Sequence, residues 1–196
     1  MEVPTYNYQK STLSDTTDYS ERTDKLYFKS IELTKAELKV KNLSRDQYCR
    51  IGKNNEAEIH FILDDHFNTR FYADPDIYGK HDFYNNTKGE MFNKKWATMA
   101  VEVKSRLDIT HNRYPTAFID VHKVKAQLPN IDYWYVYIYA DGIYTIQYDT
   151  NLFKGYEINL NAIGYREDVG RVECSPRYEI PYQHLTKICN LVESTE

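Results

Sequence analysis

The stretch Met99-Ala-Val-Glu-Val-Lys-Ser105 determines how we interpret this chain, because its valines predict a strand whose side chains alternate between two faces. Val101 and Val103 are therefore expected to face the core. Glu102 and Lys104 then share the other face, about 7 Å apart along the strand. A carboxylate beside an ammonium on a rigid strand suits a metal ligand and a water-orienting cation. A surface ion pair, which stabilises by only about 0–1 kcal/mol, is the alternative interpretation.

Length and composition indicate one globular domain with a sizeable core. The chain has 196 residues, of which 41% are hydrophobic and 28% are charged. No apolar run approaches the roughly 18 residues of a membrane span, and the N-terminus lacks a signal-peptide pattern, so we expect no membrane association. The cysteines, which are few and widely spaced, indicate reduced thiols in a cytoplasmic protein rather than disulfides or a zinc site: Cys49, Cys174 and Cys189.

Charge is unevenly distributed along the chain. The net charge is −4, yet residues 88–125 contain eight Lys and Arg against four acids. This local positive surplus suits a surface that faces phosphates. A solvated charged surface explains the same count equally well.

The N-terminal part differs in composition from the remainder. Residues 1–30 are expected to be a polar arm, because their Ser-, Thr- and Asp-rich sequence lacks periodicity over most of its length. Residues 31–196 are expected to form a single domain. Near its start a capping box predicts a short helix over 35–41, in which a second Glu-x-Lys pair, Glu37 and Lys39, would not share a face.

Hydrophobic periodicity predicts helices and strands in the order α-β-β-β-α-β-β. One helix is expected from Asn54 or Asn55 to about Phe67, and Asp120 is expected to cap another that ends before Pro129. The main strands are expected over 69–73, 81–84, 96–105, 132–140 and 143–148. Further extended segments are expected at 114–119, 152–163 and 177–180, followed by a terminal helix over 182–191. This order predicts an α/β or α+β fold with a central mixed sheet flanked by helices.

The segment 132–140 has the clearest strand pattern. Its tyrosines alternate with apolar residues, which places the tyrosines on one face of the strand and Trp134, Val136 and Ile138 on the other. The dipeptide Asp141-Gly142 that follows predicts a two-residue hairpin turn.

Two further acids are placed where they can meet the motif strand. If strands 81–84 and 96–105 pair antiparallel, Asp82 lies close to Glu102 across the sheet. Glu56 lies on the apolar stripe of the first helix, where a buried carboxylate needs a partner; the alternative is an exposed acid near a helix N-terminus. Two carboxylates, a main-chain carbonyl and waters form an oxygen site suited to Mg²⁺ or Mn²⁺.

These residues resemble the signature of the PD-(D/E)XK nuclease superfamily, whose members share a restriction-endonuclease-like core. The signature places an Asp on one strand and Glu-x-Lys on a later one; here Asp82 is followed after 20 positions by Glu102-Val103-Lys104. An acid in the preceding helix is common in the family, and Glu56 fits that place. The resemblance covers about residues 52–150 and leaves 151–196 as a C-terminal extension.

The first acid of the signature has an alternative. A literal Pro-Asp occurs at Pro75-Asp76, so Asp76 is the other candidate. We favour Asp82, because the surroundings of Pro75 predict a turn whereas Asp82 belongs to a predicted strand.

The resemblance implies a metal-dependent endonuclease that hydrolyses DNA phosphodiester bonds, with Mg²⁺ or Mn²⁺ as cofactor. Asp82, Glu102 and the carbonyl of Val103 would ligate the ion. Lys104 would orient the attacking water or stabilise developing charge, and burial is expected to lower its pKa. Glu56 would hold a second ion or order metal-bound waters. Phosphate contacts are expected from three residues, of which the first two share a helix face: Lys123, Gln127 and Arg106.

A different class of function fits the same residues. A catalytically inactive protein that keeps the nuclease-like fold would act as a DNA-binding or structural component, consistent with the acidic net charge. Residues 151–196 would supply either DNA specificity or a homodimer contact. The six histidines contain no closely spaced pair of the kind that zinc sites use.

Overall fold

The computed structural model describes most of the chain, namely residues 2–11, 26–29, 45–76, 79–86, 94–107, 109–125, 129–166 and 171–194. The predicted helix over 35–41 and the predicted phosphate contact Gln127 lie outside these residues. Among the described residues, no helix is long and apolar enough to span a membrane.

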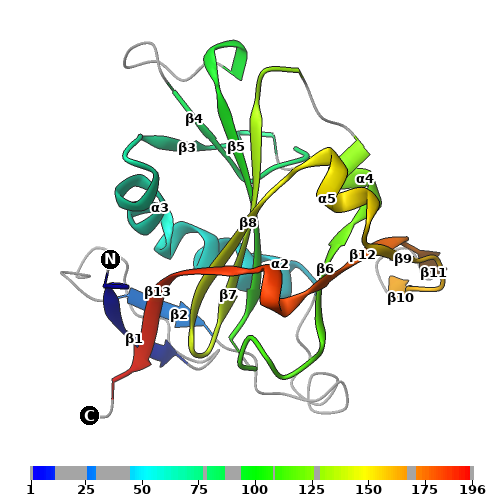
Figure 1. Ribbon diagram of the computed structural model, residues 1–196. Coiled ribbons are helices and arrows are strands. Elements are labelled where there is room, and N and C mark those ends of the chain that lie inside the picture. Colours follow the sequence, from blue (N-terminus) through cyan, green and yellow to red (C-terminus); the bar gives the residue numbers. More distant parts are fainter. Residues whose placement is uncertain are drawn as a thin grey trace.

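An eight-stranded mixed sheet, curled like half of a barrel, dominates the molecule (Figure 1). Across the sheet the strands follow the order β2 (Leu26–Lys29), β1 (Thr5–Ser11), β13 (Thr186–Glu193), β8 (Gly142–Gln147), β7 (Asp132–Tyr139), β5 (Met99–Arg106), β4 (Phe83–Asn85) and β3 (Phe71–Ala73). Three neighbouring pairs are parallel: β2 with β1, β1 with β13, and β7 with β5. The remaining pairs are antiparallel.

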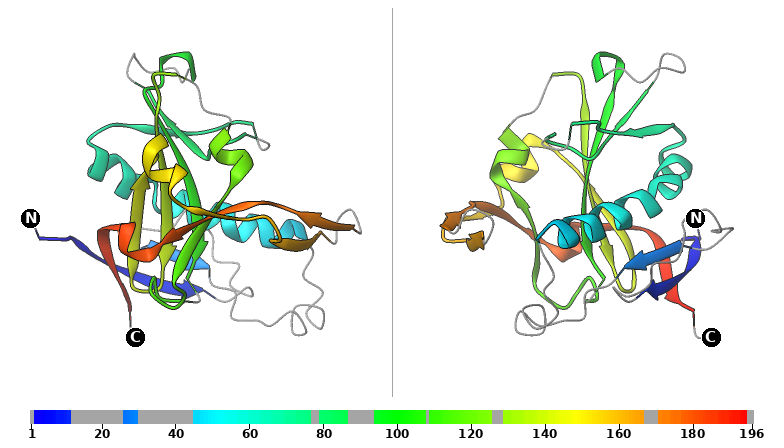
Figure 2. Two further views of the ribbon diagram at one scale, coloured as in Figure 1. Left: turned by 45° about the vertical axis from the view of Figure 1, so that its right-hand side comes forward. Right: turned by 180° about the vertical axis from the view of Figure 1, so that it is seen from behind.

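Different elements cover the two faces of this sheet (Figure 2). Helices α2 (Arg45–Glu58) and α3 (His60–Phe67) lie over one face, where Ile59, Ile62 and Leu63 join the larger apolar cluster. The other face packs on short helices and a small sheet: α4 (Val121–Lys125), α5 (Thr150–Lys154), β6 (Thr116–Asp120), β12 (Arg177–Pro181) and β9 (Glu157–Asn159). A two-stranded ribbon continues outward from the small sheet, β10 (Ile163–Arg166) with β11 (Arg171–Cys174). Short 3₁₀ turns cover Lys94–Trp96 and Tyr182–His184.

The alternation predicted for 132–140 is confirmed in β7. Tyr135, Tyr137 and Tyr139 pack in the cluster beneath the small sheet, whereas Val136 and Ile138 pack toward α3. The two-residue turn lies one position earlier than predicted, at Ala140 and Asp141, and Gly142 begins β8 opposite Tyr139. Gly142 has a φ of 156°, a backbone conformation that an L side chain rarely adopts. The β7–β8 hairpin is thus encoded locally.

The expected order of helices and strands is confirmed between residues 45 and 147 with two differences. Two consecutive helices, α2 and α3, take the place of the single helix expected to run to Phe67, and the extended segment expected at 114–119 is strand β6 of the small sheet. The mixed α/β class is confirmed, although strands outnumber helices more strongly than expected.

The prediction of a polar N-terminal arm is wrong for the described parts of residues 1–30, which form β1 and β2. Tyr8, Leu26 and Phe28 are buried in the core. Asn55 of α2 fixes β2, because its amide accepts from Lys29 N–H at 2.8 Å and donates to Lys29 C=O at 3.0 Å. It also donates to Ser105 Oγ on β5 at 2.9 Å.

The same asparagine explains why the predicted start of the first helix is wrong. The helix begins at Arg45, and Asn55 lies in its last turns rather than at its N-cap. Its amide makes buried tertiary bonds that a sequence pattern does not distinguish from capping. The predicted terminal helix over 182–191 is also wrong, because β13 fills the gap between β1 and β8. The segment 152–163 contains α5 before its strand β9.

Candidate functional site

Strand β5 presents the Glu-x-Lys pair as predicted. Val101 and Val103 are buried in the cluster against α3, and the Nζ atom of Lys104 lies 2.7 Å from Oε1 of Glu102. Glu102 is 2% exposed, so the pair is not a solvated surface ion pair. A buried charge pair of this kind is retained only with further polar partners.

Asp82 lies beside this pair at the beginning of β4. Its N–H donates to Val101 C=O at 2.9 Å, and its Oδ2 accepts from Val103 N–H at 2.7 Å. A strand residue directs its N–H and C=O toward the same edge, so the Val103 carbonyl faces the side from which Asp82 approaches. The predicted convergence of Asp82 with the motif strand is therefore present.

Glu102 has a second lysine partner, which comes from the short helix α4. Lys123 Nζ lies 3.1 Å from Oε2 of Glu102 and donates to Gly79 C=O at 3.3 Å. Each oxygen of the carboxylate thus faces an ammonium. The structure places Lys123 on the acidic site itself rather than on a separate phosphate-binding face.

The three acids influence one another electrostatically. Burial and the charges of Asp82 and Glu102 raise the pKa of Glu56 to about 8. Burial and the charge of Glu102 raise the pKa of Asp82 to about 6, although the bond from Val103 N–H and the nearby lysines act in the opposite direction. The two lysines consequently offset only part of the negative charge that gathers here.

The expectation of a lowered pKa for Lys104 is wrong. Burial does lower it, but the charges of Glu102 and Asp82 and the hydrogen bond to Glu102 more than compensate, so the pKa lies above its usual value. Lys104 is therefore an ammonium at neutral pH. It can stabilise negative charge or orient water, but it is not a neutral base.

A cavity of about 310 Å³ opens beside these acids. Glu56 and Asp82 line it together with Asp76, the alternative first acid. The wall also contains polar residues that the sequence analysis did not single out: Lys53, His60, Asp74 and His81. Asp76 lies in the loop before β4, where its N–H donates to Asp74 Oδ1 at 3.0 Å. Asp76 thus contributes to the wall of the cavity, whereas Asp82 is bonded to the motif strand.

A close approach between Asp74 and Gly79 shapes the part of the cavity wall that precedes β4. A Cβ added at Gly79 would lie 2.2 Å from Asp74 Oδ2, so only glycine fits this close approach. Asp74 Oδ2 also accepts from Lys94 Nζ at 2.5 Å. Pro75, Asp76 and Gly79 predicted a turn in this part of the chain. They did not indicate that its residues would line the cavity.

His81 is a further residue of the cavity wall that the sequence analysis did not single out. It is 2% exposed, and its Nε2 has no hydrogen-bond partner among the described residues. Burial lowers its pKa to about 4, so the ring is neutral. Its position next to Asp82 in the sequence is the signal that could have identified it.

The side chains and carbonyl at this site offer oxygen ligands for a divalent cation. Among the described residues, no group of three or more His, Cys, Asp or Glu side chains lies close enough to hold a metal ion. Two carboxylates and the Val103 carbonyl remain, all of them hard oxygen donors that suit Mg²⁺ or Mn²⁺ completed by water. The raised pKa values of Asp82 and Glu56 also fit: burial and, second to it, repulsion among the acids raise them, and a cation would relieve that repulsion.

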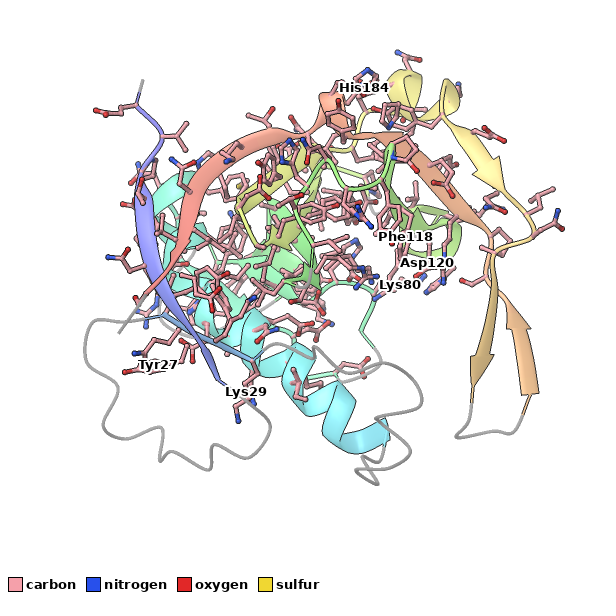
Figure 3. The ribbon with its side chains drawn as sticks, turned by 90° about the horizontal axis from the view of Figure 1, so that it is seen from below. Tyr27, Lys29, Lys80, Phe118, Asp120 and His184 are labelled. Atoms are coloured by element: carbon pink, nitrogen blue, oxygen red, sulfur yellow. The ribbon has the colours of Figure 1, made fainter. Side chains whose placement is uncertain are left out.

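Arg106 lies two residues beyond Lys104 on β5, but it lines a different cavity, described below. Its Nη1 donates to Ser105 C=O at 2.7 Å, and its guanidinium lies 5.0 Å from the centre of the Phe118 ring. Figure 3 shows Phe118 and Asp120 on β6, where the small sheet joins the body of the molecule.

Comparisons of the chain with protein-family models, with curated proteins and with solved structures found no match.

Proposed function

We propose that this protein is a metal-dependent nuclease of the PD-(D/E)XK type that hydrolyses DNA phosphodiester bonds. One observation carries the proposal: Asp82 accepts from Val103 N–H at 2.7 Å, which brings an acid from a separate strand onto the Glu102-Val103-Lys104 motif. A structural ion pair between Glu102 and Lys104 does not require Asp82 as a second, poorly compensated carboxylate. The helix acid Glu56 lies within electrostatic range of both others.

In this proposal Asp82, Glu102 and the Val103 carbonyl would hold Mg²⁺ or Mn²⁺. When bound, such an ion polarises a phosphate and lowers the pKa of a water ligand. Lys104, already an ammonium, would stabilise charge that develops on the phosphate. Glu56 lies within electrostatic range of Asp82 and Glu102 and would hold a second ion or order water ligands of the first.

The test combines metal binding with cleavage. Wild-type protein is titrated with Mn²⁺ in a calorimeter, and plasmid, single-stranded and branched DNA are incubated with it in Mn²⁺ or in EDTA. We expect a binding isotherm and metal-dependent cutting, both lost in Asp82→Asn and Glu102→Gln. Intact DNA of every kind in the presence of Mn²⁺ would contradict the proposal.

A second function is favoured by one specific observation. Both oxygens of Glu102 already face lysines, at 2.7 and 3.1 Å, so the site is partly neutralised without any metal. A catalytically inactive DNA-binding or structural component would keep such a pair for stability. Its expected results are no Mn²⁺ isotherm and DNA binding that EDTA leaves unchanged.

A further inference from the structure

A second cavity, of about 420 Å³, adjoins the acidic site through Lys104. Its volume falls within the range of roughly 300–1,000 Å³ that small-molecule sites occupy. The walls come from β5, β6, β7 and the segment 109–116. The lining residues that matter here are Lys104, Arg106, His111, Tyr114, Phe118 and Tyr139.

Cations gather on the side of this cavity that faces the acidic site. Lys104 and Arg106 both line it from β5, and Arg106 is held against the Phe118 ring. The acid in the wall, Glu179, is engaged on both oxygens, since it accepts from the Thr116 hydroxyl and, at 3.4 Å, from Asn159 Nδ2. A phosphate group entering here would meet two cations and an acid already satisfied by its neighbours.

Aromatic rings form much of the remaining wall. Tyr139 lies 6.1 Å from Tyr137, with the two rings nearly parallel at 15°, and Tyr114 stands at the rim with 58% of its surface exposed. An exposed tyrosine beside a cation-lined hollow is an arrangement on which nucleic-acid bases stack.

The cavity also holds a fixed imidazole. His111 Nδ1 lies 2.6 Å from Oδ2 of Asp141, and the Tyr144 hydroxyl donates to the same oxygen at 2.7 Å. Nδ1–H therefore donates to Asp141, which fixes the ring and leaves Nε2 as its second polar atom. Nε2 can form a hydrogen bond with a polar group on the edge of a base.

We propose that this cavity binds one unpaired nucleotide of the DNA strand being cut, with its base against Tyr114 and its phosphate beside Lys104 and Arg106. The inference rests on the proposed function, because Lys104 joins this cavity to the proposed cleavage site. A base inside a duplex is stacked and paired and does not enter such a hollow without being extruded. The preferred substrate is thus single-stranded DNA or a single-stranded extension, rather than blunt duplex.

The experiment measures binding without cleavage. A fluorescein-labelled single-stranded oligonucleotide and a blunt hairpin duplex are titrated with the full chain in EDTA, and fluorescence anisotropy is recorded. We expect tighter binding of the single strand, weakened by about tenfold in Tyr114→Ala and in Arg106→Ala. Tyr114→Phe should bind like wild type, because stacking requires the ring and not the hydroxyl. Tyr72→Ala, on the edge strand β3, is the matched control.

The outcomes separate this proposal from the proposed nuclease activity. Equal affinity of wild type and Tyr114→Ala for the single strand, or equal affinity for duplex, overturns the nucleotide site even if the protein cuts DNA with Mn²⁺. Loss of single-strand binding in Tyr114→Ala supports the nucleotide site even if no DNA is cut. Near-ultraviolet circular dichroism of each variant establishes that its fold is retained.

Discussion

Lys123 Nζ lies 3.1 Å from Oε2 of Glu102, although the two residues are 21 positions apart in the chain. The contact joins helix α4 to the centre of the motif strand, and it places a cation where a divalent ion would otherwise compensate the carboxylate. If Glu102 binds a metal ion as proposed, Lys123 would compete with that ion for the carboxylate, in contrast to the phosphate contact expected from its position on the helix.

Replacing Lys123 with Ala should tighten Mn²⁺ binding by about fivefold or more, because a cation that competes for the buried Glu102 carboxylate is removed and even solvated ion pairs contribute about 1 kcal/mol. Calorimetric titration measures the change. Lys125→Ala, an exposed lysine on the same helix, is the control. Weaker Mn²⁺ binding in Lys123→Ala would instead mean that the lysine orders the carboxylate for the metal.

Replacing Lys104 with Ala should lower the rate of DNA cleavage by about a hundredfold or more, because a charge-stabilising group next to the phosphate is lost. Mn²⁺ binding should remain, since Lys104 is not a ligand. Because the pKa of Lys104 is raised, its deprotonation should leave no step in the pH–rate profile near neutrality. Single-turnover cleavage of a labelled oligonucleotide is the appropriate assay, with the exposed Lys95→Ala as control.

The two candidates for the first acid should behave differently. Asp82→Asn should abolish Mn²⁺ binding and cleavage, whereas Asp76→Asn, in the loop, should keep both. The reason is that the Asp82 carboxylate accepts from Val103 N–H of the motif strand, whereas Asp76 lies in the loop and contacts Asp74 through its main-chain N–H. The reverse result would make Asp76 the metal ligand.

Glu56 should make the free energy of unfolding depend on pH. Its pKa is raised from 4.5 to about 8, so the folded state binds this proton more tightly than the unfolded state. The stabilising contribution is present below about pH 4.5 and is lost as the pH rises toward 8. Glu56→Gln should thus be more stable than wild type at pH 8, by about 4 kcal/mol, and nearly equal to it at pH 4.5.

Urea unfolding of Glu56→Gln and wild type at both pH values tests this expectation. Glu157→Gln, an exposed acid on β9, serves as the control and should show no such difference. A variant that is destabilised equally at both pH values would indicate a packing role for the Glu56 side chain rather than an electrostatic one.

Asn85 should be essential for the alignment of β4 with β5. It is buried, its Oδ1 accepts from the N–H groups of Thr98 and Met99 at 2.8 Å each, and its Nδ2 donates to Thr98 Oγ1. Asn85→Ala removes the acceptor of two main-chain donors, the N–H groups of Thr98 and Met99, and should destabilise the protein by about 2 kcal/mol. Thermal unfolding measures the loss; an unchanged midpoint would contradict this role.

Local sequence patterns were sufficient for the centre of the site. The β4 and β5 strands are close in the chain and antiparallel, so the approach of Asp82 to Glu102 followed from strand periodicity and pairing alone. The second partner of Glu102 was not predictable in this way, because the direction of the Lys123 side chain depends on where α4 packs after β6 crosses to the small sheet.

The C-terminal strand shows where local patterns fail. Leu185, Ile188 and Leu191 recur at a spacing that also suits a helix, yet the segment is buried between β1 and β8 as a strand. Its pairing with Thr5 at Asn190 spans almost the entire chain. Such distant partners decide the conformation, and no window of sequence contains both.

The position of β13 also has a consequence during synthesis. Tyr8 of β1 and its partner Glu193 of β13 are 185 positions apart in the chain. At a translation rate of about 5–20 residues per second, the main-chain groups of Tyr8 wait roughly ten seconds or longer for the strand that pairs with them. A nascent chain of this protein therefore displays one unpaired edge of β1 until β13 emerges, and in that interval a chaperone would have most to protect.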